Sequence, residues 1–343
     1  MASPSFREPE LRDPVDLCTP SGTLDPAAVG WSRRPLHRCA LPAGWPRRKR
    51  WEFWGLLTDT HLLRITYGAT DYVGTLVVSF LDYEEGKRVE HASLVPFAWG
   101  MPFPDVVGGA PIEFSGGGAR LRLADENDGR RIQVEVATRA MRLEADVHVA
   151  LPPAHETLSV VIPWSDTSFQ YTSKHNARPA SGFVKLGDAG YLFSPENHAF
   201  GCLDFGRGVW PYDTRWNWAA ASGVQGERVV GLNLGGQWTD GTGLTENGVC
   251  VDGTLHKIGE DLVWEYDVRD VRRPWRICAP QSRRVDLRFT PMIDEHQATN
   301  LLIVRSELHW CLGRFDGWIV DDAGERIEIR DLLGWAEAHT ARW

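Results

Sequence analysis

The stretch ARLRLADENDGRRIQVEVA, residues 119–137, carries the clearest fold signal in the chain. Apolar residues alternate with polar or charged ones at 119–123 and again at 132–136. Because successive side chains of a strand point to opposite faces, this alternation predicts two strands, each with one buried face. Residues 126–129 read Glu-Asn-Asp-Gly, the composition of a tight turn. The stretch therefore predicts an antiparallel hairpin.

Short strands of the same kind are predicted along most of the chain after residue 50. A convincing helical stripe is expected only at 332–341, as one short terminal helix. Many short strands separated by turn signals predict an all-β fold of two tandem β-barrel or β-sandwich units. Further predicted strands fall at 62–67, 72–81, 143–149, 181–185, 191–193, 228–234, 244–251, 262–266, 285–289, 301–308 and 310–320.

The chain divides into three parts by composition. Residues 1–50 are rich in prolines and turn formers and lack periodicity, while Trp31 and Trp45 indicate that this extended segment packs on the rest. A weak boundary between predicted strands separates 51–165 from 166–343. Each of these parts is expected to form one β unit, and the second is expected to carry a Trp-rich pocket.

The composition is that of a soluble globular protein, with 43% hydrophobic and 24% charged residues among 343. A net charge of −9 argues against a nucleic-acid partner, because phosphate contact requires a basic face. No segment approaches the roughly 20 apolar residues of a membrane-spanning helix, and the amino terminus lacks a signal-peptide pattern. We therefore expect a cytoplasmic protein without integral membrane association. Its oligomeric state is not indicated.

Cofactor signatures are missing from the sequence. There is no phosphate-binding loop, dinucleotide fingerprint, Gly-x-Ser-x-Gly elbow or His-Glu-x-x-His zinc helix. Cys18, His37 and Cys39 lack an evident fourth zinc ligand. The six cysteines have no paired spacing and are expected to be free thiols. No metal or cofactor is expected.

Tryptophan is the unusual residue of this chain, with 16 copies. Several fall in GRGVWPYDTRWNW, residues 206–218, among charged residues and glycines, a mixture typical of a concave ligand site. In a strand, Trp216 and Trp218 share one face. The alternative is that the tryptophans fill a large β core. The expected ligand-binding residues are Trp210, Tyr212, Trp216, Trp218, Asn233, Trp238 and Asn247.

Five charged or titratable residues near these tryptophans are candidate catalytic groups. Asp204 is the preferred acid, because burial among tryptophans would raise its pKa, and Arg207 is its expected partner across a turn. Asp240 lies in a loop and is a turn residue or a proton donor. Glu246 begins a later strand, and His175 is the best histidine candidate.

Several segments together resemble the family catalogued as domain of unknown function 2804, over nearly the whole chain. The segments are LCTPSG, VGWSRRPLHRC, KRWEFWG, KHNARPASG, LDFGRGVWPYDTRWNWA, GLNLGGQWTDGTGLTEN and LLGWAEAHTARW. More distantly, the chain resembles the lipocalin-like, or calycin-like, group that includes carotenoid hydratases and tocopherol cyclases. That resemblance implies two β-barrel or sandwich units and an apolar, isoprenoid-like ligand.

The leading hypothesis is a protein that binds a hydrophobic small molecule, an isoprenoid or lipid, in a Trp-lined cup and protonates it for hydration, cyclisation or isomerisation. Tryptophan faces would stabilise the resulting cation. A second hypothesis is a non-catalytic lipid or isoprenoid carrier with the same cup. A third is a carbohydrate-active or carbohydrate-binding protein, which as a glycosidase requires two carboxylates about 5 to 10 Å apart across a cleft.

Overall fold

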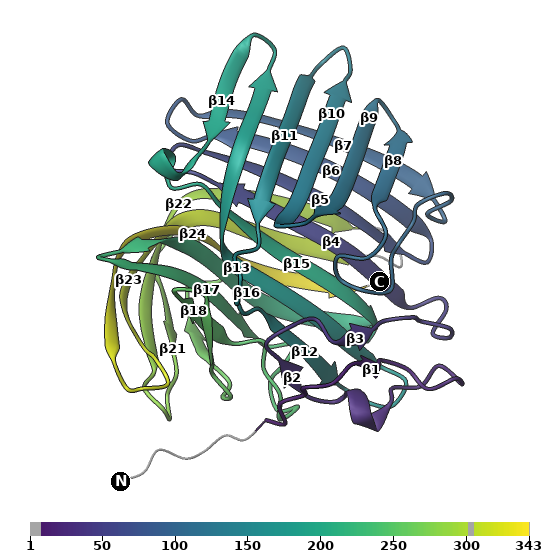
Figure 1. The fold of residues 1–343 in the computed structure, drawn as a ribbon, viewed down its shortest axis with the longest axis vertical. Helices are drawn as coiled ribbons and strands as arrows, with labels where there is room; N and C mark the ends of the chain where they lie inside the picture. Colours follow the sequence, from purple (N-terminus) through teal and green to yellow (C-terminus); the bar gives the residue numbers. More distant parts are fainter. Residues whose placement is uncertain (1–7, 301–304, 343) are drawn as a thin grey trace.

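A computed structural model describes residues 8–300 and 305–342, and these residues form two large antiparallel β-sheets (Figure 1). The predicted all-β class is confirmed. The first sheet contains β2 (Trp31–Ser32), β4 (Arg48–Leu57), β5 (His61–Thr70), β6 (Val73–Asp82), β7 (Lys87–Pro96), β8 (Ile112–Gly116), β9 (Ala119–Glu126), β10 (Gly129–Ala137), β11 (Arg142–Ala150), β12 (Leu158–Pro163), β13 (Phe169–Leu186), β14 (Ala189–Phe193) and β15 (Phe200–Val209).

The second sheet follows directly in the chain. It contains β16 (Asp213–Gln225), β17 (Arg228–Gly236), β18 (Gly248–Val251), β19 (Thr254–Lys257), β20 (Val263–Glu265), β21 (Trp275–Cys278), β22 (Val285–Asn300), β23 (Arg305–Val320) and β24 (Arg326–Arg342). A small parallel pair, β1 (Val15–Asp16) and β3 (His37–Arg38), and two 3₁₀ turns, η1 (Pro26–Ala28) and η2 (Pro195–Asn197), complete the described elements.

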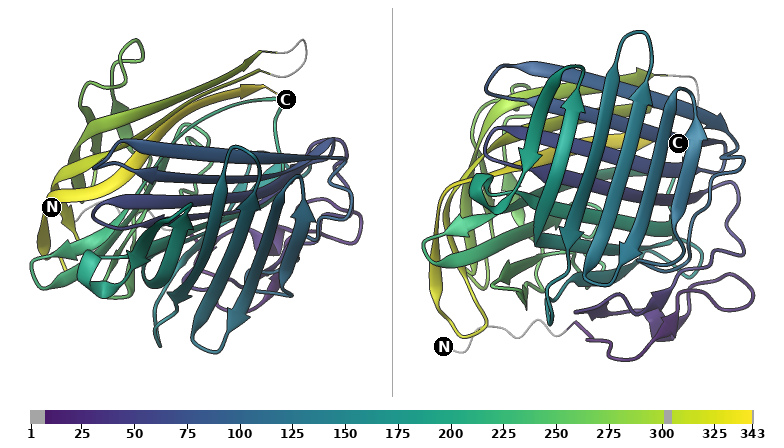
Figure 2. Two further views of the ribbon diagram at one scale, coloured as in Figure 1. Left: turned by 90° about the horizontal axis from the view of Figure 1, so that it is seen from above. Right: turned by 45° about the horizontal axis from the view of Figure 1, so that its top comes forward.

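The first sheet folds over on itself. Its strands run in the order β7-β6-β5-β4-β15-β13-β11-β10-β9-β8, and β4–β7 form one layer that crosses the layer of β8–β11 at a large angle (Figure 2). Alternate side chains from both layers, among them Ile65 and Val78 from one and Ile132 and Val147 from the other, are fully buried between them. The hairpin predicted at 119–137 is confirmed as β9 and β10, with Glu126 opposite Gly129.

The second sheet packs on both faces. One face encloses its own core, which includes Leu232, Leu287 and Phe289. The other face lies against the outside of the first sheet, where Trp335 packs with residues such as Leu62. Successive side chains of β16 and β24 point to opposite faces. One face of each strand therefore packs in the second sheet's own core, and the other packs against the first sheet.

The helix predicted at 332–341 is wrong, because these residues form the second half of β24. Leu, Ala and Glu in LLGWAEA are good helix formers. The segment nevertheless pairs on both sides, with β16 and β23, and tertiary pairing outweighs a weak local preference. Of the strand predicted at 301–308, residues 301–304 lie outside the described residues and the rest begins β23.

The chain passes from the first sheet to the second between Val209 and Asp213. The division at 165/166 as a domain boundary stays a prediction. Among the described residues, β2 of the segment before residue 50 pairs with β12. All six cysteines are free thiols, as predicted. No helix within 8–300 or 305–342 is long and apolar enough to cross a membrane.

Candidate functional site

A cavity of about 470 Å³ lies between the outer face of the first sheet and the second sheet. We call this cavity the chamber. One wall comes mainly from β4, β5, β6, β13 and β15, and the other from β16, β23 and β24. The aromatic and charged residues on its walls include Lys49, Trp51, Phe53, Arg64, Lys174, Asp204, Trp210, Trp216, Trp218, Trp238, Glu246, Trp310, Glu337 and His339.

Tryptophans form much of the apolar lining. Trp210 stacks on Trp238 with ring centroids 5.8 Å apart and planes 11° from parallel. Trp216 meets Trp210 edge to face at 5.7 Å. Trp218 points from the same face of β16 as Trp216, as strand alternation requires. Four tryptophans expected to bind a ligand thus surround one cavity, while others, such as Trp275, are core residues.

Three charged side chains form a closed cluster at the chamber wall. The Lys174 ammonium lies 2.9 Å from Asp204 Oδ2 and 3.1 Å from Glu246 Oε2, and 4.3 Å from the ring centroid of Trp218. Thr172 donates to Asp204 Oδ1 at 3.0 Å. Burial would lower the pKa of Lys174, but the two carboxylates raise it above its ordinary value. In this Lys174 cluster one ammonium contacts two carboxyl groups, and burial raises the pKa of Glu246.

Glu337 is the carboxyl group whose environment differs most from that cluster. On β24 it stands in register between Trp218 of β16 and Trp310 of β23. Trp216 Nε1 donates to its Oε2 at 3.3 Å, and no basic side chain of the described ranges pairs with it. Burial raises the pKa of Glu337 to about 7. A carboxyl group with this pKa can donate a proton at neutral pH.

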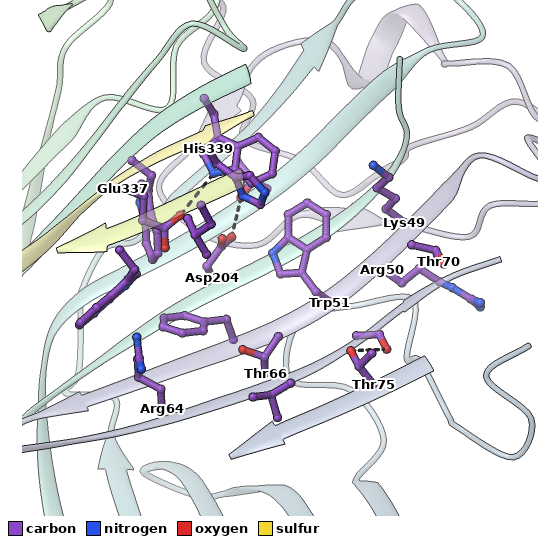
Figure 3. A pocket seen from close by; sticks show the side chains of 18 of the residues that line it. Lys49, Arg50, Trp51, Arg64, Thr66, Thr70, Thr75, Asp204, Glu337 and His339 are labelled. Atoms are coloured by element: carbon purple, nitrogen blue, oxygen red, sulfur yellow. Dashed lines mark hydrogen bonds between the residues drawn. The ribbon is translucent and has the colours of Figure 1, made fainter. Parts of the chain in front are cut away.

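Two basic side chains of the chamber have pKa values below 7. Burial, with the nearby Arg47, lowers the pKa of Lys49 to about 5. Burial, with the nearby Lys49, lowers the pKa of His339 to about 3. The His339 ring lies 3.9 Å from that of Trp216. Figure 3 shows Glu337 and His339 side by side on β24, opposite strands that carry Arg64 and Trp51. The chamber therefore holds an acid and two candidate proton acceptors.

The predicted pairing of Asp204 with Arg207 is wrong. Both residues lie on β15, where residues three apart point to opposite faces. Arg207 is 1% exposed and donates to the backbone carbonyl oxygens of Trp51, Gly206 and Pro104. The partner of Asp204 is Lys174 instead. The turn expected at 204–207 is continuous strand, which is why the pair cannot form.

Three other predicted residues lie away from the chamber wall. His175 is next to Lys174 on β13 and faces a different cavity. Asp240 is exposed and accepts from the backbone N–H of Gln237, as a turn residue does. Tyr212 lies beside the guanidinium groups of Arg47 and Arg342, with its ring centroid 5.3 Å and 5.0 Å away.

The two predicted asparagines lie behind the wall. Asn233 accepts from Trp218 Nε1 at 2.9 Å and donates to the backbone oxygen of Glu246 at 2.6 Å. Asn247 accepts from the backbone N–H of Gly235 at 2.6 Å. A Cβ atom at position 235 would clash with the side chain of Glu246, so Gly235 makes this close approach possible. Both amides hold wall residues in place rather than reaching the chamber.

The chamber residues that sequence reasoning missed include Lys49, Lys174, Glu337 and His339. The spacing Trp335-x-Glu337-x-His339 puts all three side chains on one face of a strand, but the helix interpretation concealed it. Lys174 was overlooked beside His175. Of the candidate acids, Asp204 and Glu246 share one ammonium, which disfavours the arrangement of a glycosidase, with its carboxylates on either side of a bound sugar.

Comparison with known proteins identifies the family. The family model for a domain of unknown function (DUF2804) matches residues 8–343, so the chain belongs to that family, as predicted. Kievitone hydratase from Nectria haematococca has a similar structure, with a TM-score of 0.50 and 9% identity over 89% of this chain and 94% of that chain. A structure of CghA aligns with a TM-score of 0.43 and 10% identity over 87% and 88% of the two chains. No curated protein matches the sequence.

Proposed function

We propose that this member of the domain of unknown function 2804 family binds an apolar, unsaturated small molecule in the chamber and protonates it, with Glu337 as the acid. The observation that carries the proposal is the Glu337 carboxyl, raised in pKa to about 7 and set between tryptophans at the wall of a cavity. The structural likeness to a hydratase supports hydration as one outcome of the protonation.

The proposed chemistry begins with transfer of the Glu337 proton to one carbon of a carbon–carbon double bond. The electron pair of the π bond forms the new C–H bond and leaves a cation on the other carbon. Trp218 and Trp310 flank the carboxyl group, and their faces stabilise a cation through the ring quadrupole.

The fate of the cation decides the reaction class. Addition of a water molecule, with loss of one of its protons to neutral His339 or Lys49, gives hydration. Attack by a second double bond of the same molecule, followed by proton loss, gives cyclisation. Loss of a different proton from carbon gives isomerisation. In each case the proton returns to the Glu337 carboxylate through the acceptor or the solvent, which completes the cycle.

The Lys174 cluster acts as a positioning element in this proposal. Lys174 lies against the Trp218 ring and is fixed by Asp204 and Glu246. Trp238 donates to Glu246 Oε1 at 2.6 Å, so the same cluster also orients a second lining ring. Asp204, the acid expected from the sequence, thereby holds the aromatic wall and leaves the proton transfer to Glu337.

The test starts from the compound that co-purifies with the protein from its own host, identified by native mass spectrometry and organic extraction. The purified protein is incubated with that compound in D₂O, and deuterium at carbon is measured by mass spectrometry. We expect incorporation by the wild type and a fall of about 10²- to 10⁴-fold in Glu337→Gln with binding retained, the usual worth of a general acid.

Three results would contradict the proposal. Binding without deuterium incorporation by the wild type would make the protein a carrier, the alternative that shares the same cup. Incorporation that survives in Glu337→Gln but not in Asp204→Asn would return the acid role to Asp204. If no apolar compound co-purifies and tryptophan fluorescence does not respond to a panel of unsaturated terpenoids and fatty acids, the chamber is not a ligand site.

A further inference from the structure

A second cavity, of about 500 Å³, lies on the opposite face of the strands that form the chamber wall. On β4, Trp51 and Phe53 face the chamber, whereas Glu52 and Trp54 face the second cavity. On β15, Leu203 faces the second cavity and its neighbour Asp204 faces the chamber. The same strands thus separate two unlike cavities.

Arg178 is the notable residue of this second cavity. Its side chain is buried, with the residue 3% exposed, yet no carboxylate of the described residues forms an ion pair with it. It donates to the backbone oxygens of Ala150 and Val149 at 2.8 Å and 2.9 Å and to His175 Nδ1 at 3.3 Å. A guanidinium has five N–H groups, so two remain for another acceptor.

His175 does not neutralise this charge. Arg178 can only donate, so His175 Nδ1 accepts, and in the neutral ring Nε2 carries the proton and donates to Ser173 Oγ at 3.1 Å. Burial and the adjacent Arg178 hold the pKa of His175 well below its ordinary value. An unpaired buried cation costs free energy unless an anion accompanies it.

Two other arginines of this cavity have carboxylate partners, and a third, Arg34, is exposed to solvent. Arg130 is buried and donates to Glu52 Oε1 at 2.9 Å and Asp125 Oδ1 at 2.6 Å. Its Nε–H has no acceptor. Arg33 pairs with Glu156 at 2.7 Å. Arg130 and Arg178 together carry two positive charges against the two negative charges of Glu52 and Asp125, but both carboxylates contact Arg130 and neither forms an ion pair with Arg178. A dianion in this cavity would meet the negative charges of Glu52 and Asp125.

Apolar residues form one part of the remaining lining. Trp54 presents its ring within 5.6 Å of the Arg178 guanidinium, and Pro35, Val107, Leu151 and Pro152 also line the cavity, beside polar residues such as Asn127 and Thr157. We propose that this second cavity binds an organic monocarboxylate, with the carboxylate on Arg178 and an apolar body against Trp54. Arginine presents parallel N–H groups that match a carboxylate, and the apolar walls favour an organic acid over a free inorganic anion.

The test is calorimetric titration of the full chain with 1-naphthoate, its neutral analogue 1-naphthamide and inorganic phosphate. We expect 1-naphthoate to bind at least about tenfold more tightly than the other two. Leu151 is 43% exposed at the edge of the cavity, so Leu151→Glu adds a negative charge there without disturbing the core. We expect it to weaken 1-naphthoate about tenfold, whereas Leu151→Gln, equal in size and neutral, should change the affinity less than about twofold.

Arg178→Gln should abolish 1-naphthoate binding where the variant folds, and the Leu151 pair keeps the proposal testable where it does not. Equal affinity for 1-naphthoate and 1-naphthamide would overturn the proposal, and so would equal weakening by Leu151→Glu and Leu151→Gln. Arg178 would then have only a structural role, as a hydrogen-bonded link between β13 and β11. Phosphate binding as tight as that of 1-naphthoate would also overturn it, in favour of a general anion site. The Leu151 pair assigns the binding to this cavity rather than to the chamber, because Leu151 lines the second cavity and not the chamber.

Discussion

The Lys174 cluster and the Glu337 region lie in one chamber but treat buried charge in opposite ways. In the cluster, one ammonium contacts the carboxylates of Asp204 and Glu246. On β24, burial raises the pKa of Glu337 and lowers the pKa of His339, and both shifts favour the neutral form of the side chain. The comparison indicates that the ion pairs of the Lys174 cluster hold the chamber wall rigid. Glu337 and His339, whose pKa values are shifted, form the part of the site that can exchange protons.

The largest expected effect is on the paired region. Lys174→Met would leave Asp204 and Glu246 as adjacent carboxylates without a cation, and breaking a buried pair in this way costs about 3–5 kcal/mol of unfolding free energy. Urea denaturation at pH 7 measures it. Lys185→Met, the same substitution at an exposed lysine of the same strand, should change stability by less than about 0.5 kcal/mol. Similar losses in both variants would mean that the contacts of Lys174 with the two carboxylates do not stabilise the protein.

The second effect concerns the pH dependence of stability at Glu337. Its pKa in the folded protein, about 7, lies above its ordinary value of 4.5. Below about pH 4 this carboxyl group is protonated in both the folded and the unfolded protein, so it does not lower the free energy of unfolding. As pH rises the unfolded protein loses the proton first, and the loss of stability grows until it becomes constant above about pH 7. Glu337→Gln removes that cost. The gain in unfolding free energy of the variant over the wild type should therefore be roughly 3 kcal/mol larger at pH 8 than at pH 4.

Denaturation curves of wild type and Glu337→Gln at pH 4 and pH 8 provide the measurement. Glutamine keeps an oxygen that can accept from Trp216 Nε1, so the hydrogen bond is preserved. A difference between the variants that does not change with pH would contradict a shifted carboxyl group at this position.

A smaller effect is expected where an aromatic ring of the chamber lies on a glycine. A Cβ atom at Gly206 would come within 2.1 Å of the Trp51 ring, so Gly206→Ala should displace the ring and cost about 1–3 kcal/mol. Tryptophan fluorescence and thermal unfolding detect both changes. Gly190→Ala, at a strand glycine with open space around it, is the control. Unchanged fluorescence in Gly206→Ala would show that the ring does not need that space.

The smallest effect is expected for Asp204→Asn. Lys174 keeps Glu246 as a partner, and the amide oxygen can still accept a hydrogen bond. Deuterium incorporation into the co-purified compound should therefore fall less than about tenfold, far less than in Glu337→Gln. A loss as large as that of Glu337→Gln would remove the distinction between the two regions.

The sequence predicts most of the fold because alternation is a local signal. Residues 119–137 form the predicted hairpin, and strand geometry correctly places Trp216 and Trp218 on one wall. It does not show which distant strands meet. Lys174 and Asp204 are thirty residues apart in the chain and become neighbours only when β13 pairs with β15.

Two errors in the predicted site have a physical cause. The helix-forming composition of residues 332–341 hid the face that Glu337 and His339 share, because pairing with two strands decides its conformation. Asp204 and Arg207 looked like partners across a turn, but strand geometry separates them. The pKa of Glu337 depends on burial between two sheets, which no local pattern encodes.

The measurement that tests the central claim most directly is a titration of the Glu337 carboxyl group by ¹³C NMR, with the side-chain carboxyl carbons of glutamate labelled. The resonance is assigned by its loss in Glu337→Gln. We predict a midpoint near pH 7, well separated from the exposed glutamates. A midpoint near the ordinary value of 4.5 would show an ionised carboxylate at neutral pH and would contradict the role of Glu337 as the proton donor.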